Sequence, residues 1–292
     1  MALNRSEPES VWLAFSFIIR LRFQTVSSTN DKKNYGRFRF VHEPLDSIDK
    51  NDETHRADFP FSAELNKRRY PVRTLRYWWL ARVIDEEVVR LEHPPTIVDV
   101  GCDRGIIKRF IPPIEGAKWI GLDIDINRPD VELANYDERI QADFDEGLPV
   151  SDATADIAIC SHVLEHLPRP DFAMGEIFRL LKPGGMLLVG VPTAPKFIAR
   201  LREKQFQKQL ANGSRVHGQH IHVFDSERLT DLATRTGFVV EYLTGTALLR
   251  KKGSKLENYA AWIRFNQIGA SLFPSIGQEL CMQLRKPGSW PS

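Results

Sequence analysis

The chain carries the sequence DVGCDRG at residues 99–105, where an apolar run ends. Its two glycines, Gly101 and Gly105, allow a sharp turn that brings backbone N–H groups close to a ligand. A dinucleotide-binding turn would have glycine where Asp103 stands, and an acidic side chain there would repel a pyrophosphate. The spacing therefore disfavours a nicotinamide-dependent dehydrogenase and leaves open a positively charged cofactor that bears a nucleoside.

Acidic residues also follow the next two segments of the chain. Asp123 ends the apolar run Trp119–Leu122, about 20 residues beyond the glycine loop, where a carboxylate can accept hydrogen bonds from both hydroxyls of a ribose. Asp143 is followed by Phe144, a pair that could bind an adenine amino group and cover the base. Each acid could instead be a solvated residue at a strand end, and Phe144 a core side chain. Three such positions in succession favour an adenosine-containing cofactor.

Five of the eight histidines lie between residues 162 and 222. On a helical turn His162, Glu165 and His166 would share one face, and the sequence HGQHIH follows at 217–222. One interpretation is a general base for an oxygen acceptor, with His162 favoured because it directly follows a strand. Another is a divalent metal bound by these three residues and a later histidine. In the third, the histidines only stabilise loops. We take His162, His166 and His220 as the catalytic candidates and assign no metal ligand.

Short, mostly unbroken apolar runs predict the strands that must position these residues. Because strands buried on both faces read this way, the runs indicate a parallel sheet covered by helices. Such an open, doubly wound sheet binds ligands beyond the carboxyl ends of its strands. The predicted strands are Thr96–Val100, Trp119–Leu122, Ile157–Cys160, Met186–Val191 and Phe238–Leu243.

Helical spacing of apolar residues predicts the intervening helices. One covers Thr74–Leu91, one covers Pro195–Leu210, and one ends at Lys182–Gly185. Another begins after an N-cap at Asp225 or Ser226. Arginines alternate with aromatic residues before residue 80. This segment could stack on a base or grip an acidic acceptor, or its aromatic residues could pack on the core while the arginines face solvent.

The domain organisation follows from changes in composition along the chain. Residues 1–60 are polar and charged and are expected to form a poorly ordered N-terminal arm. Residues 61–92 are expected to form a lid helix region. Residues 93–292 form the main domain, with a lid-like insertion near 245–277.

The composition limits the possible functions of the 292 residues. A net charge of +2 gives no support for a general nucleic-acid-binding surface. Three scattered cysteines argue against a disulfide framework and suit a reducing compartment. The apolar segment Val11–Ile19 is too short to span a bilayer. We therefore expect a cytoplasmic protein without a membrane span.

Four stretches of the chain resemble the successive motifs of class I S-adenosylmethionine-dependent methyltransferases: IVDVGCDRG, WIGLDID, QADFDEGLPVSDATADIAICSHVLEHL and RLLKPGGMLLVGVP. The likeness is greatest to the broad group that includes ubiquinone-biosynthesis methyltransferases. It implies an α/β, Rossmann-like, doubly wound and mostly parallel sheet with helices on both faces. The sheet would have seven strands, and the tail SLFPSIGQELCMQLRKP resembles the last, antiparallel strand of that group.

The resemblance also implies S-adenosyl-L-methionine as the cofactor. The glycine loop would surround its methionine part, Asp123 would hold the ribose, and Asp143 with Phe144 would hold the adenine. Most relatives have glycine where this chain has Asp103, and we expect this acid to be tolerated beside the cationic side of the ligand. The implied cofactor site consists of Asp99, Gly101, Cys102, Gly105, Asp123, Ile124, Asp143, Phe144 and Ser161.

The sequence thus predicts an enzyme that transfers a methyl group to a small-molecule acceptor, at oxygen because of the histidines. Two alternatives stay open: a nucleic-acid methyltransferase, and a degenerate scaffold that binds the cofactor without turnover. The acceptor and the oligomeric state are not determined by the sequence.

Overall fold

The computed structural model describes residues 71–128, 131–194, 201, 203–204, 208, 220–249, 256 and 259–288. The predicted arm, the segment Val11–Ile19 and His217 lie outside these residues, as does most of the predicted helix Pro195–Leu210. The predicted domain boundaries therefore stay predictions.

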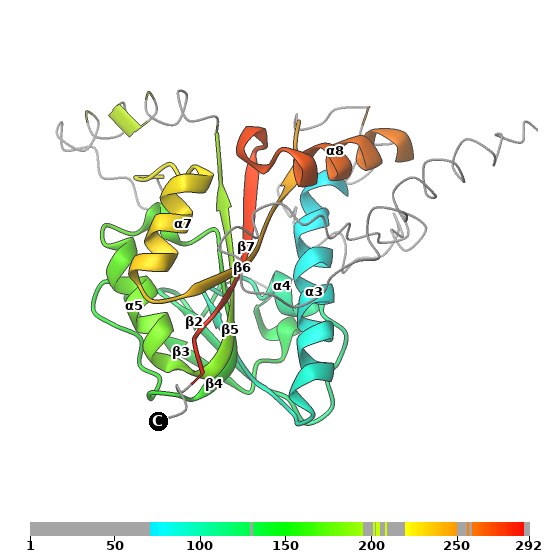
Figure 1. Ribbon diagram of the computed structural model, residues 1–292. Helices are drawn as coiled ribbons and strands as arrows, with labels where there is room; N and C mark the ends of the chain where they lie inside the picture. Colours follow the sequence, from blue (N-terminus) through cyan, green and yellow to red (C-terminus); the bar gives the residue numbers. More distant parts are fainter. Residues whose placement is uncertain are drawn as a thin grey trace, which may run out of the picture. The chain divides into compact units, whose positions relative to one another are not determined.

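Seven strands form one sheet, in the spatial order β3-β2-β1-β4-β5-β7-β6 (Figure 1). Strand β7 pairs antiparallel with both β5 and β6, while the other pairs are parallel. The predicted fold class, a mostly parallel sheet of seven strands with its last strand antiparallel, is confirmed. The strands are β1 (Thr96–Val100), β2 (Lys118–Asp123), β3 (Glu138–Gln141), β4 (Ala155–Ser161), β5 (Leu181–Pro192), β6 (Val239–Ala247) and β7 (Glu279–Arg285).

Helices connect and cover the strands. The α-helices are α3 (Pro71–Leu91), α4 (Ile106–Phe110), α5 (Pro170–Leu180), α7 (Ser226–Arg235) and α8 (Ala260–Leu272). Short 3₁₀ helices are η3 (Val131–Ala134), η4 (Leu164–His166) and η6 (Pro274–Ile276). The predicted N-cap is Asp225, whose side chain accepts a hydrogen bond from the Arg228 N–H. Helix α5 ends before the predicted stop at residues 182–185, because β5 already begins at Leu181.

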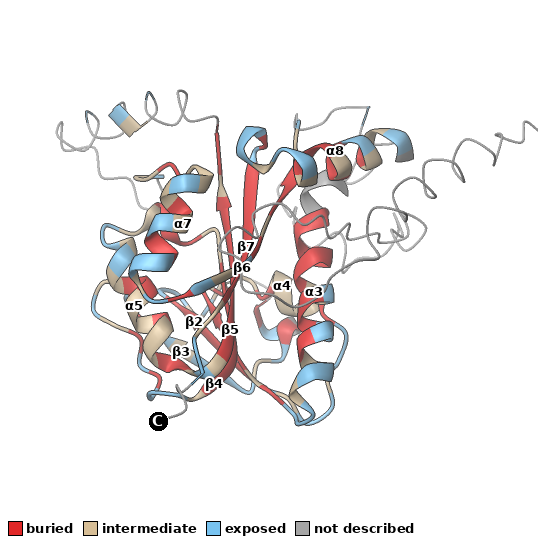
Figure 2. Cartoon of the chain, viewed as in Figure 1, coloured by how far each residue is buried: buried red, intermediate tan, exposed pale blue. Residues whose placement is uncertain are grey.

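Alternate residues of the central strands point to opposite faces of the sheet, and each face has its own hydrophobic cluster. In β4, Ala158 and Cys160 pack with α5 and α7 on one face. Ile157 and Ile159 pack with α3 on the other. Figure 2 shows the central strands buried between these helices, whose outer sides are exposed.

Helix α3 is a core element. Trp79, Leu80, Val83 and Ile84 are buried in the cluster that α3 forms with the sheet. The described part of the predicted lid region, residues 61–92, is α3, which buries its apolar stripe against the sheet. A lid function of this region stays a prediction.

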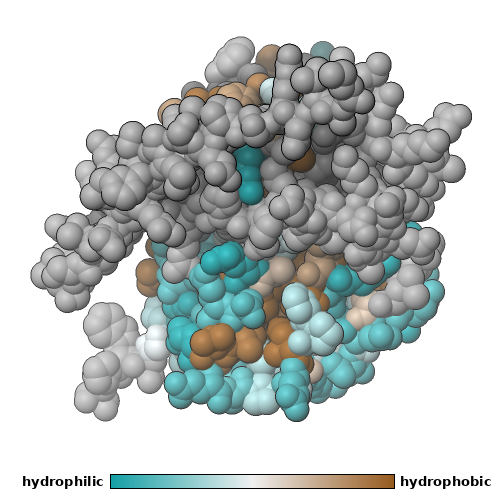
Figure 3. Space-filling view, turned by 90° about the vertical axis from the view of Figure 1, so that its right-hand side faces the viewer, coloured by the Kyte–Doolittle hydropathy of each residue, from teal (hydrophilic) through white to brown (hydrophobic). Residues whose placement is uncertain are grey.

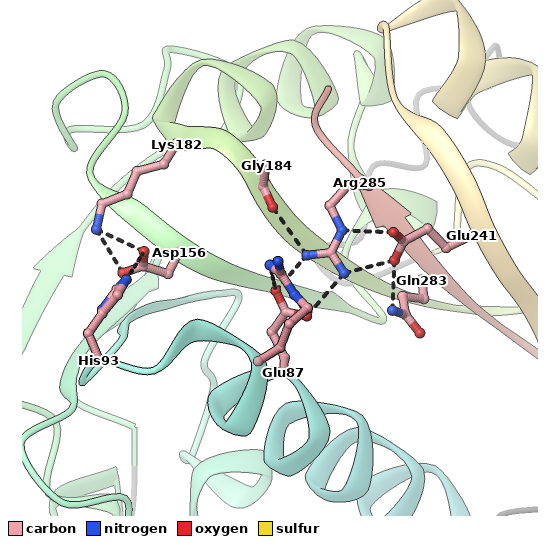
Figure 4. Close-up of polar contacts among 9 residues, drawn as sticks. Glu87, His93, Asp156, Lys182, Gly184, Glu241, Gln283 and Arg285 are labelled. Carbon is pink, nitrogen blue, oxygen red and sulfur yellow. Dashed lines mark hydrogen bonds and ion pairs between the residues drawn. The ribbon is translucent and has the colours of Figure 1, made fainter. Parts of the chain in front are cut away.

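Ion pairs connect the elements at the amino ends of the parallel strands (Figure 4). Arg285 Nη1 lies 2.5 Å from Glu87 Oε1, and Arg285 Nε lies 2.9 Å from Glu241 Oε1. Asp156 accepts hydrogen bonds from Lys182 Nζ and from the Thr96 N–H. These contacts join α3 to β7 and β6, and β4 to β5 and β1, so this edge of the sheet is occupied by structural contacts.

Two further sequence expectations concern membrane spans and disulfides. On the face shown in Figure 3, the described surface mixes hydrophilic side chains with smaller hydrophobic areas. Within the described ranges, no helix combines the length and apolar character that a membrane span requires. Cys102, Cys160 and Cys281 are free and buried, in agreement with the absence of a disulfide framework.

Candidate functional site

Four strands end side by side at the opposite edge of the sheet, and the predicted site residues follow them. Val100 of β1 pairs with Leu122 of β2 and with Cys160 of β4, and Asp123 pairs with Gln141 of β3. In the sheet, β1 lies between β2 and β4. The carboxyl ends of β1 and β4 therefore form the topological switch point, where ligands bind in open α/β sheets.

The loop after β1 is a tight turn that requires its glycines. Gly101 and Gly105 have φ values of +80° and +68°. A Cβ at Gly101 would lie 2.2 Å from Cγ2 of Val163, and one at Gly105 would lie 2.2 Å from Cβ of Ala134. Asp103 also has a positive φ, +45°. Because side chains destabilise this left-handed region, Asp103 occupies a position that glycine would suit better.

Backbone hydrogen bonds fasten this turn to β2. The N–H groups of Gly101 and Cys102 donate to the carbonyl of Leu122, at 2.8 and 2.9 Å. The Cys102 thiol is buried, and burial together with the nearby carboxylates raises its pKa. The thiol is therefore neutral, and the structural contribution of Cys102 is to hold the turn. Its contact with a cofactor stays a prediction.

Asp99 is a buried carboxyl group with one oxygen unused. Its Oδ2 accepts a hydrogen bond from the Tyr136 hydroxyl at 2.6 Å. Its Oδ1 is buried and accepts no hydrogen bond from the residues that the structure describes. Burial is the main cause that raises the pKa of Asp99 to about 7. The charges of Asp123 and Asp103 add to this shift, and the Tyr136 hydrogen bond opposes it. A bound cation would reduce the repulsion between these carboxylates, and a bound hydrogen-bond donor would pair with the unused Oδ1.

The carboxylate of Asp123 joins the loops after β1 and β2. Its Oδ2 accepts from the Asp103 N–H at 2.8 Å, and its Oδ1 accepts from the Asp125 N–H at 3.1 Å. The Arg128 Nε lies 3.9 Å from Asp123 Oδ1 and 3.5 Å from Asp103 Oδ1. Since a carboxylate offers about four acceptor positions, Asp123 retains capacity for ligand hydroxyls. Sequence reasoning missed Arg128, because nothing in its local pattern marks it.

The remaining cofactor candidates differ in how exposed they are. Ile124 is 40% exposed beside Asp123, so it presents an apolar surface at the edge of the sheet. Asp143 is exposed, and its Oδ1 accepts from the Asp145 N–H at 3.0 Å. Ser161 is half-buried at the end of β4. Phe144 belongs to the hydrophobic cluster with only 7% exposure, so most of its ring is buried in the core, and its contact with an adenine stays a prediction.

The histidines gather around one buried acid, Glu165. The Oε1 of Glu165 lies 3.4 Å from His162 Nδ1 and 3.7 Å from His166 Nε2. The rings of His166 and His220 meet edge to face, with centroids 4.8 Å apart. The Glu165 carbonyl accepts from the N–H groups of Ile221 and His222, which holds the later histidine segment against the first. His162 precedes η4 and has a φ of +60°. His162, Glu165 and His166 therefore come together through a strained turn and a 3₁₀ helix, and not on one face of a helix as the sequence predicted.

A metal ion could be held by part of this group. Ligand atoms of Glu165, His166 and His220 lie within 4.8 Å of one another. Glu165 is 1% exposed, and within the described part of the chain neither of its carboxylate oxygens accepts a hydrogen bond. Two imidazoles and a carboxylate are a donor set that suits divalent transition metals. The geometry is therefore compatible with both the metal and the general-base interpretations.

A buried ion pair that sequence reasoning missed lies on the other side of His162. Arg76 Nη1 donates to Glu279 Oε1 at 2.9 Å, and Nε2 of His162 lies 2.5 Å from the same oxygen. Arg76, expected to bind an acceptor or face solvent, is 6% exposed. No local signal could reveal this contact, because Arg76 and Glu279 are 203 positions apart.

The fold and the arrangement of this edge define a class of protein. A seven-stranded sheet with one antiparallel strand, a glycine turn after β1 and acidic residues after β1, β2 and β3 are the features that the sequence motifs led us to expect of a Rossmann-like methyltransferase. A family model described as a methyltransferase domain matches residues 73–243, more than half of the chain. The chain belongs to this family, and the resemblance seen in the sequence is confirmed at that level.

Curated relatives are similar over part of their length. A probable S-adenosylmethionine-dependent methyltransferase of Mycolicibacterium smegmatis is 28% identical over 51% of this chain and 54% of that protein. A sterol methyltransferase-like protein of Botryococcus braunii is 31% identical over 35% of this chain and 28% of its own length. A ubiquinone biosynthesis O-methyltransferase of Vibrio atlanticus is 30% identical over 30% of this chain and 40% of its own. The chain thus spans about half or less of the length of these relatives.

A solved structure shows the same fold. The crystal structure of a candidate sarcosine dimethylglycine methyltransferase from Galdieria sulphuraria has a TM-score of 0.52 and 18% sequence identity. The match covers 74% of this chain and 85% of that one. At this identity the likeness concerns the fold.

Proposed function

We propose that this chain transfers the methyl group of S-adenosylmethionine to an oxygen atom of a small-molecule acceptor. The observation that carries the proposal is the gathering of His162, His166 and His220 around buried Glu165 at the carboxyl edge of the sheet. S-adenosylmethionine supplies, when bound, a methyl group on a positively charged sulfur. The protein must then mainly align the acceptor, exclude water and take up the acceptor's proton.

The side chains at the edge fit this cofactor. Asp99 has a buried oxygen that accepts no hydrogen bond from any described residue, which suits an ammonium group or another donor. Asp123 has remaining acceptor capacity for ribose hydroxyls. The charge of Asp123 helps to raise the pKa of both Asp99 and Asp103, so a cationic ligand would be favoured over a pyrophosphate.

The choice of oxygen as the acceptor atom rests on the histidines. The names of the relatives include both an O-methyltransferase and a sterol methyltransferase, so they support methyl transfer without selecting the atom. A neutral hydroxyl needs a base, and imidazole is the side chain that titrates near neutral pH. A nucleic-acid acceptor has weaker support, because the net charge is only +2.

Binding of S-adenosylhomocysteine, measured by titration calorimetry, tests the cofactor site. We expect the unmodified chain to bind, and Asp123→Ala to weaken binding by about 1–3 kcal/mol, because a hydrogen-bonding carboxylate is lost. Asp125→Ala is the matched control, since the Asp125 side chain is exposed and accepts only from the nearby Asn127 N–H among the described contacts. Unchanged affinity in Asp123→Ala would assign the ribose to another residue. No binding by the unmodified chain would contradict the proposed cofactor site, whereas binding without any methyl transfer would favour the degenerate scaffold.

Methylation of a cell extract with radiolabelled S-adenosylmethionine, followed by mass analysis, tests the reaction itself. We expect a labelled small molecule with the methyl group on oxygen. We expect exhaustive chelation to leave the rate unchanged, since the proposal assigns proton removal to histidine. If chelation abolished labelling and a divalent metal restored it, Glu165, His166 and His220 would be reassigned as metal ligands.

A further inference from the structure

Three side chains from distant elements meet at the Nε2 atom of His162. This atom lies 2.5 Å from Glu279 Oε1 and 2.6 Å from Arg76 Nη1. Arg76 belongs to α3, His162 follows β4, and Glu279 is the first residue of β7. Because β7 runs antiparallel to its neighbours, its first residue lies at the edge where the parallel strands end. The cluster therefore belongs to the candidate site.

Glu279 is ionised and firmly held. It is 3% exposed, and its Oε2 accepts a hydrogen bond from the Thr246 hydroxyl at 2.8 Å. Burial alone would raise the pKa of Glu279, but the adjacent Arg76 and His162 hold it well below its usual range. The buried charge is thus balanced by Arg76, and a carboxylate with two fixed partners can orient a third group.

The two contacts of Nε2 cannot both be hydrogen bonds. If Arg76 donated to Nε2, this nitrogen would carry a lone pair and would face the lone pairs of a carboxylate oxygen at 2.5 Å. If Nε2 carries the proton, it donates to the Glu279 carboxylate in a short, charge-assisted hydrogen bond. In the second arrangement Arg76 Nη1 donates to the same carboxylate oxygen at 2.9 Å instead of to Nε2, so the lone-pair repulsion is avoided. In the neutral ring the other nitrogen, Nδ1, then carries no proton.

The Nδ1 atom faces the second buried acid of the site. Glu165 Oε1 is 3.4 Å away, and among described residues no group donates a hydrogen bond to this carboxylate. A proton arriving at Nδ1 would create an imidazolium between two carboxylates, Glu279 at Nε2 and Glu165 near Nδ1.

We propose that Glu279 is a positioning residue that fixes the Nε2–H tautomer of His162 and so leaves Nδ1 to accept the acceptor's proton. This rests on the proposed methyl transfer to oxygen. As the new O–CH₃ bond forms, the S–CH₃ bond breaks and S-adenosylhomocysteine leaves as a neutral thioether. The hydroxyl proton passes to Nδ1 and then to solvent, which reaches His162 because its side chain is 28% exposed.

The tautomer can be measured without knowing the acceptor. We expect nitrogen NMR of the full chain labelled at histidine, with His162 assigned through His162→Gln, to show Nε2–H as the main form at pH 8. In Glu279→Gln the carboxylate no longer attracts this proton, so Arg76 donates to Nε2 and the proton moves to Nδ1, beside Glu165. Labelling of the extract acceptor should then fall at least about 10-fold, since a positioned base contributes that much or more.

Thr246→Val is the matched control, because it removes one hydrogen bond from the same carboxylate and leaves its charge. It should keep the Nε2–H form, and both variants should bind S-adenosylhomocysteine within twofold of the unmodified chain. An Nδ1–H form in the unmodified chain would overturn the proposal, as would an unchanged tautomer in folded Glu279→Gln. If Glu279→Gln does not fold, Glu279→Asp replaces it: a tautomer shift supports the proposal, and Nδ1–H in the unmodified chain still refutes it. If the unmodified chain did not bind S-adenosylhomocysteine, the result would instead count against the proposed function.

Discussion

Single carboxyl groups at the edge of the sheet carry more than one task each. Asp123 accepts hydrogen bonds from two backbone N–H groups that belong to different loops, and it lies near Arg128. The same oxygens are the predicted partners of the ribose. Loop geometry and ligand recognition are therefore coupled at this residue, and a substitution here will change both.

Replacement of Asp103 separates backbone strain from charge. Asp103→Gly removes a side chain from a position with φ +45°, whereas Asp103→Ala removes the carboxylate and keeps the strain. We expect the glycine variant to be more stable than the alanine variant by about 1 kcal/mol, measured by urea unfolding. S-adenosylhomocysteine binding should be retained or improved in Asp103→Gly. Complete loss of binding would show that the carboxylate itself is needed.

Elements are joined differently at the two edges of the sheet. At the amino ends of the parallel strands, charged residues pair with one another, as Glu87, Arg285 and Glu241 do. At the carboxyl ends, Asp99 and Glu165 have buried oxygens that accept no hydrogen bond from described residues. Charged side chains that are paired stabilise the fold, whereas buried carboxylate oxygens without a hydrogen bond can accept one from a ligand or take up a proton. The elements thus separate a structural edge from a functional one.

The structural edge can be tested through Glu87. Burial alone would raise the pKa of Glu87, but hydrogen bonds from Arg90 and Arg285 lower it. Glu87→Gln removes the charge that balances these arginines, so the free energy of unfolding should fall by about 2–4 kcal/mol. Glu86→Gln, one position along α3 and more exposed, should change it by less than about 0.5 kcal/mol.

Urea unfolding gives the free energy of unfolding of both variants. Each folded variant should bind S-adenosylhomocysteine as tightly as the unmodified chain does. Equal stabilities for the two variants would mean that the ion pairs of Figure 4 do not hold α3 to β7.

The stability of the whole molecule should depend on the ionisation of Asp99. Its pKa is raised to about 7 in the folded chain, against an ordinary value of 3.8. Between these values the folded state binds the proton that the unfolded state has lost. The stabilisation is therefore fully present below about pH 4 and is lost as the pH rises through 7.

Asp99→Asn should abolish this loss, because an amide keeps the oxygen for Tyr136 and does not ionise. The stability of the unmodified chain relative to Asp99→Asn should fall by about 2–3 kcal/mol between pH 5 and pH 8, measured by urea unfolding at each pH. Tyr136→Phe, which removes the hydrogen bond that favours ionisation, should lose more stability with pH than the unmodified chain. A pH-independent difference between the unmodified chain and Asp99→Asn would show that Asp99 ionises normally.

The sequence by itself determined the central strands and the acidic edge. Runs such as Ile157–Cys160 are apolar throughout because the sheet is covered on both faces, and that burial is visible in the residue types. β3, with the sequence ERIQ, gave no such run, because it lies at the edge of the sheet and most of its side chains are exposed. The glycine turn and the acids after the strands could be found because each lies next to the strand that places it.

Only the tertiary structure decided which distant residues complete the site. Tyr136 reaches Asp99 over 37 positions, and Glu279 reaches His162 over 117. Strand order and register bring these residues together, and no local spacing encodes either. Burial decided the rest: it placed Phe144 in the core and Arg76 in an ion pair, because both side chains lie where the packed elements exclude water.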